Sequence, residues 1–250
     1  MPPRGASLQG TRILITGAAG GVGRAVASRM LEEGAKVLLT DRDEMILRQL
    51  VETVPAEHRE RVDWATGDLS EQASLARVFE RVDQWLGGLD ILVACAGVGS
   101  GPLMEMDDAG WRYVIESNLL SYVACTKGAI ERIKASGSSS GLIILVGSIS
   151  VHIKAVGESV YNAAKGGVAS FAETLRKELI PDRIRLTLIE PGAIASAMQP
   201  FTPEERQRQM EADKLLPPAQ VAEAIMFAAS RPPGVDVVTL RIEPLDQKIY

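Results

Sequence analysis

Short apolar runs alternate along this chain with longer segments whose apolar residues recur every three or four positions. The short runs are typical of buried strands, and the recurrent spacing is typical of helices with one buried face. The runs predict strands at residues 12–16, 35–40, 61–66, 89–94, 142–146, 185–189 and 237–242. The spacing predicts helices at residues 24–33, 43–54, 71–86, 107–133, 159–180 and 219–230. This alternation favours an α/β fold, with a doubly wound sheet of about seven parallel strands flanked by helices.

Neither an internal repeat nor a break in composition divides the chain, so we expect a single domain over residues 1–250. With 46% hydrophobic residues the chain can build a large core. A formal net charge of −5, spread with both signs, argues against a nucleic-acid partner. No apolar run approaches the roughly 20 residues of a membrane span, and residues 1–7 lack the apolar part of a signal peptide. We therefore expect a cytoplasmic protein without membrane contact.

The two cysteines, Cys95 and Cys125, lie in apolar surroundings and have no paired spacing. Two cysteines and two histidines cannot build a recognisable zinc site. These counts favour a reduced protein without a metal.

A glycine-rich turn, Gly17-Ala18-Ala19-Gly20-Gly21-Val22-Gly23, separates the first predicted strand from the first predicted helix. Glycines let a backbone turn tightly and approach a pyrophosphate, whose charge meets the N–H groups and the positive end of the following helix. The G-x-G-x-x-G fingerprint does not fit, because Arg24, Ala25 and Val26 follow Gly23. The turn nevertheless predicts a dinucleotide site.

Asp41 stands at the carboxyl end of the second predicted strand, 18 positions after Gly23. A carboxylate at this place accepts hydrogen bonds from the adenosine ribose and repels a 2′-phosphate, which favours NAD over NADP. Arg42 follows at once, and an arginine can bind a 2′-phosphate, which leaves NADP open.

Tyr161 and Lys165 lie four positions apart on the helix predicted from Ser159, which we expect to cap it. Residues four apart share a helix face, so the ammonium of Lys165 is expected to lower the pKa of Tyr161 from its ordinary value of about 10. Tyr161 is therefore a candidate proton shuttle at neutral pH. The buried stripe of this helix is predicted at Ala164, Val168, Phe171, Leu175 and Leu179.

Ser148 precedes Tyr161 by 13 positions and follows the strand predicted at 142–146. Ligands bind beyond the carboxyl ends of parallel strands, so this serine is well placed for a site. With the glycine-rich turn, Ser148, Tyr161 and Lys165 resemble the short-chain dehydrogenase/reductase family, whose fold is of the Rossmann type. The resemblance runs from about Gly10 to Ile242 and includes the family's Thr-Gly-x-x-x-Gly-x-Gly form at Thr16, Gly17, Gly21 and Gly23.

The resemblance implies roles for further residues around the cofactor. It places Asp68 against the adenine, the turn at Ala96 and Gly97 close to the cofactor, and Pro191 and Gly192 beside the nicotinamide. The family usually has two asparagines before that Ala-Gly pair, and their replacement here by Ala94 and Cys95 removes hydrogen bonds between central strands. The implied cofactor set is Thr16, Gly17, Gly21, Val22, Gly23, Asp41, Arg42, Asp68, Leu69, Ala96, Gly97, Tyr161, Lys165, Pro191, Gly192, Ile194 and Ser196.

The same resemblance implies a catalytic set of Asn118, Ser148, Tyr161 and Lys165 for hydride transfer between NAD(H) and a secondary alcohol or ketone. Tyr161 handles the proton, Ser148 binds the substrate oxygen, and Lys165 also holds the nicotinamide ribose. Asparagine is unfavourable inside a helix, and in the family it holds a water that links the lysine to solvent. An NADPH-dependent reductase of 3-oxoacyl thioesters on acyl carrier protein or coenzyme A is the first alternative. A non-catalytic nucleotide-binding regulatory module is the second.

The sequence also carries indications of a substrate pocket and of an assembly. We expect residues 198–216 to form a lid, and the family implies a homodimer or homotetramer. The paired Gly166 and Gly167 favour close packing of a partner helix, because each glycine otherwise costs its helix about 1 kcal/mol. The substrate pocket is predicted to hold four apolar residues and two basic ones, namely Ile149, Val156, Met198, Phe201, His152 and Lys154.

Overall fold

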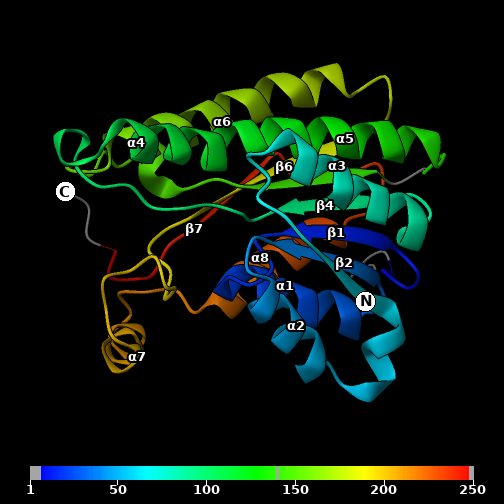
Figure 1. The fold of residues 1–250 in the computed structure, drawn as a ribbon, viewed down its shortest axis with the longest axis horizontal. Coiled ribbons are helices and arrows are strands. Elements are labelled where there is room, and N and C mark those ends of the chain that lie inside the picture. Colours follow the sequence, from blue (N-terminus) through cyan, green and yellow to red (C-terminus); the bar gives the residue numbers. More distant parts are fainter. Residues whose placement is uncertain (1–6, 139–140, 248–250) are drawn as a thin grey trace.

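The computed structural model describes residues 7–138 and 141–247. Within them lies a 7-stranded sheet of order β3-β2-β1-β4-β5-β6-β7, in which every neighbouring pair is parallel (Figure 1). The predicted doubly wound α/β fold is confirmed. The strands are β1 (Arg12–Thr16), β2 (Lys36–Asp41), β3 (Val62–Thr66), β4 (Ile91–Ala94), β5 (Leu142–Val146), β6 (Arg185–Pro191) and β7 (Thr239–Ile242).

Helices cover both faces of this sheet (Figure 1). One face carries α3 (Gln72–Arg81), α4 (Asp108–Ile115), α5 (Ser121–Ala135) and α6 (Ser159–Glu178). The other face carries α1 (Gly21–Glu32), α2 (Glu44–Thr53) and α8 (Pro218–Ala229), while α7 (Pro203–Glu211) lies away from both layers. In the described part of the chain, no helix is both long and apolar enough to span a membrane.

The central strands are apolar at successive positions because both of their faces are buried. Ile13 and Ile15 of β1 pack into the core beneath α1 and α8. Leu14, between them, packs into the opposite core with residues of α5 and α6. This burial explains why the strands could be predicted from uninterrupted apolar runs.

The structure differs from the predicted elements mainly at helix turns. The helices predicted at 71–86 and 107–133 each contain a π turn, Val82–Leu86 after α3 and Glu116–Leu120 between α4 and α5. In the second turn the Ser121 N–H donates to the Glu116 carbonyl, five residues back. One extra residue per turn does not disturb a pattern of apolar positions enough to be predicted.

The start of α6 also differs from the prediction. The helix begins at Ser159, but Glu158 occupies the cap position and no side chain caps the first turn. The expected capping role of Ser159 is therefore wrong. Residues 139–140, before β5, and residues 248–250 lie outside the described residues.

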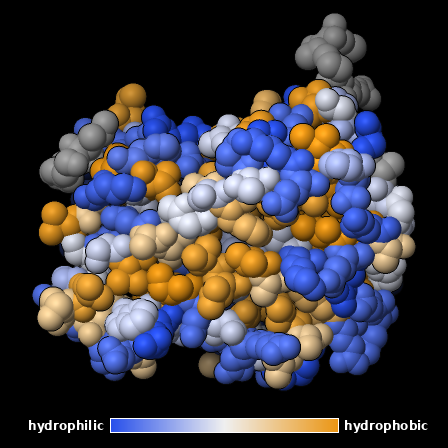
Figure 2. All heavy atoms as spheres, turned by 90° about the horizontal axis from the view of Figure 1, so that it is seen from above, coloured by the Kyte–Doolittle hydropathy of each residue, from blue (hydrophilic) through white to orange (hydrophobic). Residues whose placement is uncertain are grey.

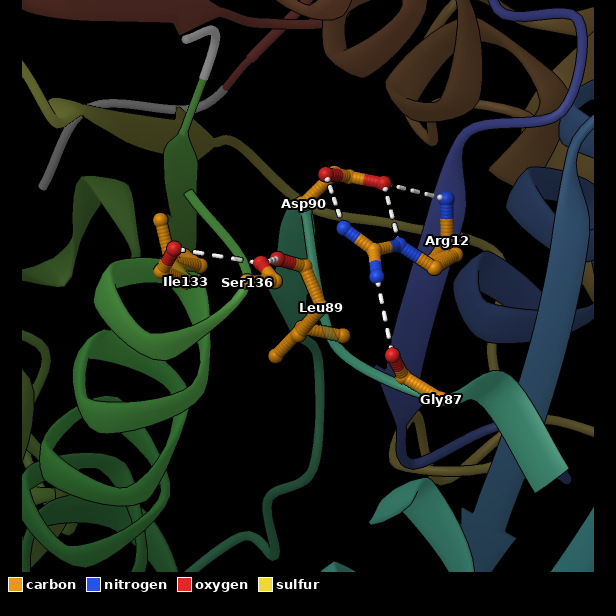
Figure 3. Close-up of polar contacts among 6 residues, drawn as sticks. All are labelled: Arg12, Gly87, Leu89, Asp90, Ile133 and Ser136. Atoms are coloured by element: carbon orange, nitrogen blue, oxygen red, sulfur yellow. Dashed lines mark hydrogen bonds and ion pairs between the residues drawn. The ribbon is translucent and has the colours of Figure 1, made fainter. Parts of the chain in front are cut away.

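An ion pair joins β1 to β4 at the amino end of the sheet, opposite the crevice described below (Figure 3). The Arg12 guanidinium donates from Nε and Nη2 to the Asp90 carboxylate, each over 2.9 Å, and the Arg12 backbone N–H donates to it as well. A third guanidinium N–H donates to the Gly87 carbonyl at 3.0 Å. Burial alone raises the pKa of Asp90, but the hydrogen bonds from Arg12 outweigh it and hold that pKa below its usual value.

We predict that Asp90→Asn lowers the free energy of unfolding at pH 7 by about 2 kcal/mol, because a largely buried guanidinium loses its partner. A carboxylate with a depressed pKa stabilises the fold above its unfolded pKa of about 4 and loses this contribution as the pH falls through the folded pKa. The difference between wild type and variant should therefore shrink below a pH of about 4. Chemical denaturation of wild type and variant, at pH 7 and again below a pH of about 4, measures this difference in the free energy of unfolding.

Lys127→Gln is the control, because it removes an exposed pair with Glu131 and should change stability by less than about 0.5 kcal/mol. Equal losses in the two variants would contradict the importance of the Arg12–Asp90 pair.

Candidate functional site

A crevice opens beyond the carboxyl ends of the strands, where the strand order reverses between β1 and β4. Its volume is about 460 Å³. Of the predicted catalytic and cofactor residues, all except Thr16 line it. From the catalytic set these are Asn118, Ser148, Tyr161 and Lys165, and from the cofactor set Gly17, Gly21, Val22, Gly23, Asp41, Arg42, Asp68, Leu69, Ala96, Gly97, Pro191, Gly192, Ile194 and Ser196.

The glycine turn leaves room for a ligand because its backbone packs without side chains. Gly17 has a φ of +65°, and a Cβ there would lie 2.6 Å from the Ala96 backbone nitrogen. A Cβ on Gly23 would lie 2.3 Å from the Gly17 carbonyl oxygen. No side chain caps α1, so the N–H groups of its first turn face the crevice. These features fit the pyrophosphate of a dinucleotide.

Thr16 is not part of the crevice wall. Its side chain is buried, and its hydroxyl accepts from the backbone N–H groups of Cys95 at 3.2 Å and Ala96 at 3.3 Å. It therefore ties the end of β1 to the turn after β4. Thr16 supports the backbone beside the crevice, and its predicted contact with the cofactor stays a prediction.

At one end of the crevice, near Asp41, a tyrosine that sequence reasoning missed joins Arg42 to Asp68. Asp41 accepts from the Ala19 N–H at 3.0 Å and from the Arg42 N–H at 2.8 Å. The Arg42 guanidinium donates to the hydroxyl of Tyr113, and that hydroxyl donates to Asp68 at 3.1 Å. Burial alone raises the pKa of Asp68, but hydrogen bonds led by Ser70 hold it below its usual value.

The side chains of Ser148 and Tyr161 both line the crevice. Ser148 begins a short 3₁₀ turn (Ile149–Val151) and accepts from the Ser150 N–H at 3.1 Å. Burial raises the pKa of Tyr161, the Ser148 hydroxyl lowers it, and the nearby Glu158 raises it further. The predicted depression of this pKa is therefore wrong, and Tyr161 is a neutral phenol at pH 7.

Lys165 is almost fully buried, and burial lowers its pKa to about 8. Its ammonium donates to the Val146 carbonyl at 2.9 Å and to the Tyr122 hydroxyl at 3.2 Å. The ammonium nitrogen lies 5.9 Å from the centre of the Tyr161 ring. The expected shared helix face is present, but the hydrogen bonds of the lysine go elsewhere, which explains why Lys165 does not lower the Tyr161 pKa.

Asn118 lies within the π turn between α4 and α5 and is fully buried. Its amide group donates to the carbonyls of Val98 and Val114, both at 2.9 Å, and accepts from the Val98 N–H. A Cβ on Gly97 would lie 2.7 Å from the Asn118 amide oxygen and 3.8 Å from the Lys165 ammonium nitrogen. The asparagine therefore holds the turn after β4 beside the lysine.

The turn after β6 completes the wall. Gly192 donates its N–H to the Ile242 carbonyl at 2.7 Å, and Ala193 donates to the Gln247 side chain at 2.9 Å. Ile194 pairs with Leu216 in a parallel bridge, which joins this turn to the end of the segment predicted as a lid. Backbone bonds to two distant segments thus hold the turn in place.

Of the six predicted substrate residues, Met198 lines the crevice. Val156 is fully exposed, His152 lies 3.0 Å from the Glu190 carboxylate, and Lys154 donates to the Val151 carbonyl at 2.7 Å. Ile149 and Phe201 are likewise not among the residues that line it. Five of these six residues therefore do not line the described crevice, and their contact with a substrate stays a prediction.

Comparisons with known proteins agree with this geometry. A family model described as short chain dehydrogenase matches residues 11–207. Cis-4-hydroxycyclohexanecarboxylate dehydrogenase of Sinomonas cyclohexanicum is 35% identical over 226 residues, which cover 87% of this chain and 88% of that protein. Dehydrogenase/reductase SDR family member 11 of Mus musculus is 31% identical over 245 residues, 94% of each chain.

Solved structures give the same result. An alcohol dehydrogenase from the archaeon Thermococcus sibiricus, complexed with 5-hydroxy-NADP, superposes with a TM-score of 0.84 at 25% identity and covers 96% of this chain and 99% of its own. A metagenomic short-chain oxidoreductase in complex with NADP has a TM-score of 0.81 at 26% identity and covers the same shares. The chain belongs to the short-chain dehydrogenase/reductase family. It is an oxidoreductase of the kind that acts on CH–OH groups with a nicotinamide dinucleotide.

Proposed function

We propose that this protein transfers a hydride between NAD(H) and a secondary alcohol or ketone, with Tyr161 as general acid and base. The observation that carries the proposal is that Ser148, Tyr161 and Lys165 line one crevice, whose glycine turn fits a pyrophosphate. The nicotinamide, when bound, supplies the hydride acceptor or donor.

The chain's own residues handle position and protons. The neutral phenol of Tyr161 is the form that donates a proton to a carbonyl oxygen, and in the oxidation direction the deprotonated form of the same oxygen takes the proton of the alcohol. Ser148 orients the substrate oxygen beside that phenol. Lys165 supplies positive charge and a ribose contact, and Asn118 holds the neighbouring backbone and completes the proton route to solvent.

We predict that Tyr161→Phe lowers kcat by about 10²–10⁴-fold, the range that general acid–base catalysis supplies. The affinity for NADH should change by less than about threefold, because the crevice keeps its shape. Steady-state kinetics and NADH fluorescence titration measure the two quantities. A variant that keeps more than roughly a tenth of the wild-type rate would remove Tyr161 from the reaction.

We propose NAD as the preferred cofactor. Asp41 places a carboxylate in the crevice wall, where a 2′-phosphate would be repelled. The Arg42 guanidinium is held by Tyr113, which in turn bonds Asp68, so this cation already has acidic and phenolic neighbours. Two observations favour NADP instead. Two structural relatives were solved with 5-hydroxy-NADP and with NADP, and Arg42 of this chain lines the crevice.

Parallel fluorescence titrations of NADH and NADPH decide between these cofactors. We expect NADH to bind wild type at least about tenfold more tightly, and Asp41→Ala to lose that preference through the loss of repulsion. Arg42→Ala is the matched variant, and it should leave NADH binding within about threefold of wild type. Tighter NADPH binding that Arg42→Ala abolishes would favour the 3-oxoacyl-thioester reductase instead.

For the substrate we propose an apolar secondary alcohol or the matching ketone, covered by residues 198–216 as a lid. Met198 is the apolar side chain of that segment that lines the crevice. The relatives named for a hydroxycyclohexanecarboxylate and for an alcohol support a CH–OH substrate. NADH binding without turnover across a broad alcohol and ketone panel would favour the regulatory module.

We also propose a homodimer or homotetramer that uses the face of α4, α5 and α6. Hydrophobic side chains spread over this face among charged ones (Figure 2), and Leu120 and Val123 are 52% and 37% exposed. Gly167 gives no support, because a Cβ there would already meet Leu119 of the same chain at 2.9 Å.

Sedimentation velocity at micromolar concentration is expected to give an oligomer for wild type and a smaller species for Val123→Glu, because a buried charge opposes association. Arg48→Gln, which removes an exposed pair with Glu44 on α2 of the opposite face, should leave the wild-type assembly unchanged. A wild-type monomer would contradict the proposal.

A further inference from the structure

A second phenol lies against the lysine of the site, although it does not line the crevice. Tyr122 is on α5, one turn after Asn118, and its side chain is 1% exposed. Its hydroxyl donates to the Val146 carbonyl, at the last residue of β5, over 3.0 Å. Nothing in the apolar pattern distinguishes this tyrosine from an ordinary core residue.

Tyr122, Val146 and Lys165 form a closed triangle of hydrogen bonds. The Lys165 ammonium donates to the Tyr122 oxygen at 3.2 Å and to the Val146 carbonyl at 2.9 Å. Its nitrogen lies 4.5 Å from the centre of the Tyr122 ring, closer than the 5.9 Å to the Tyr161 ring. The single O–H of Tyr122 is given to Val146, so its oxygen acts toward Lys165 only as an acceptor. One of the three ammonium N–H groups then remains for the crevice.

The ammonium has few other sources of stabilisation. No aspartate or glutamate of the described residues forms an ion pair with it, and the ionisable groups around it are Cys95 after β4, Tyr122 on α5 and Tyr161 on its own helix. Burial lowers the pKa of Lys165 to about 8, and Cys95 opposes this shift. Burial raises the pKa of Tyr122 far above its usual value and that of Cys125, which also faces Tyr122, to about 12. Tyr122 therefore remains a neutral acceptor over the working range of pH.

We propose that Tyr122 is a positioning residue for the reaction, which holds the Lys165 ammonium charged and aimed at the crevice by accepting its hydrogen bond. The proposal rests on the proposed function of Lys165. It assigns to α5 a support for the lysine that Tyr161, on the same helix as Lys165, does not provide.

The test is Tyr122→Phe, which keeps the ring and removes the oxygen. Loss of one acceptor from a buried cation favours its neutral form, so the alkaline limb of kcat/KM for the cofactor should move to lower pH by about one unit. Activity near pH 9 should then fall by roughly tenfold relative to wild type, while activity near pH 6 stays within about twofold.

Thr126→Val is the matched control. Thr126 lies one turn further along α5, is fully buried, and its hydroxyl has no hydrogen-bond partner among the described residues. This variant also removes one buried hydroxyl from the helix, but the pH profile should remain that of wild type. A merely structural role of Tyr122 would lower the melting temperature and leave the alkaline limb in place, and that result would overturn the proposal.

A measurement without turnover separates this proposal from the proposed function. Carbon-13 NMR of labelled lysine Cε, assigned with Lys165→Met, gives the Lys165 pKa in wild type and in Tyr122→Phe. A lower pKa in the variant supports the role of Tyr122 even if the wild type oxidises no alcohol, which would remove only the proposed function. An unchanged pKa overturns the role of Tyr122 whatever the kinetics.

If Tyr122→Phe does not fold, a fluorotyrosine placed at position 122 keeps the shape of the side chain and makes its oxygen a weaker acceptor. The alkaline limb must then move in the same direction by a smaller amount. A limb that stays at the wild-type pH contradicts the proposal.

Discussion

The arrangement of the site depends on the contact between two backbone turns at the reversal of strand order. The turn after β1 touches the turn after β4 so closely that a Cβ on Gly17 would overlap the Ala96 backbone. The Thr16 hydroxyl fastens the same two turns with bonds to Cys95 and Ala96. This contact leaves the first turn of α1 facing an open crevice. The free N–H groups of that turn favour a negative ligand, so this preference of the site depends on backbone packing as well as on charge.

The chemistry of the crevice is governed by burial rather than by a close ion pair. Burial raises the pKa of Tyr161 and lowers that of Lys165, so two values that are nearly equal in water move apart. Neutral acceptors, the Val146 carbonyl and the Tyr122 hydroxyl, compensate the ammonium. Nearby groups can shift the pKa of a cation that only neutral acceptors stabilise, as a proton-handling site requires.

Features that depend on local spacing could be predicted well. The strand positions followed from uninterrupted apolar runs, because both faces of the sheet are buried, and the helix of Tyr161 followed from its apolar stripe. The glycine turn, Asp41 and Ser148 could be placed at one edge because the carboxyl ends of parallel strands meet there. The π turn at Asn118 could not be predicted, since one extra residue per turn leaves hardly any trace in the apolar pattern.

The sequence by itself therefore determined the alternation of strands and helices, the edge of the sheet that holds the site, and most of the residues that line it. Only the tertiary structure decided the partners of those residues. It directed Lys165 to Tyr122 and Val146, bound Arg42 to Tyr113, turned Thr16 from the crevice and sent Val156 to solvent. The physical reason is that periodicity assigns a side chain to a face, whereas hydrogen bonds and pKa values depend on atoms that distant elements bring within a few ångströms.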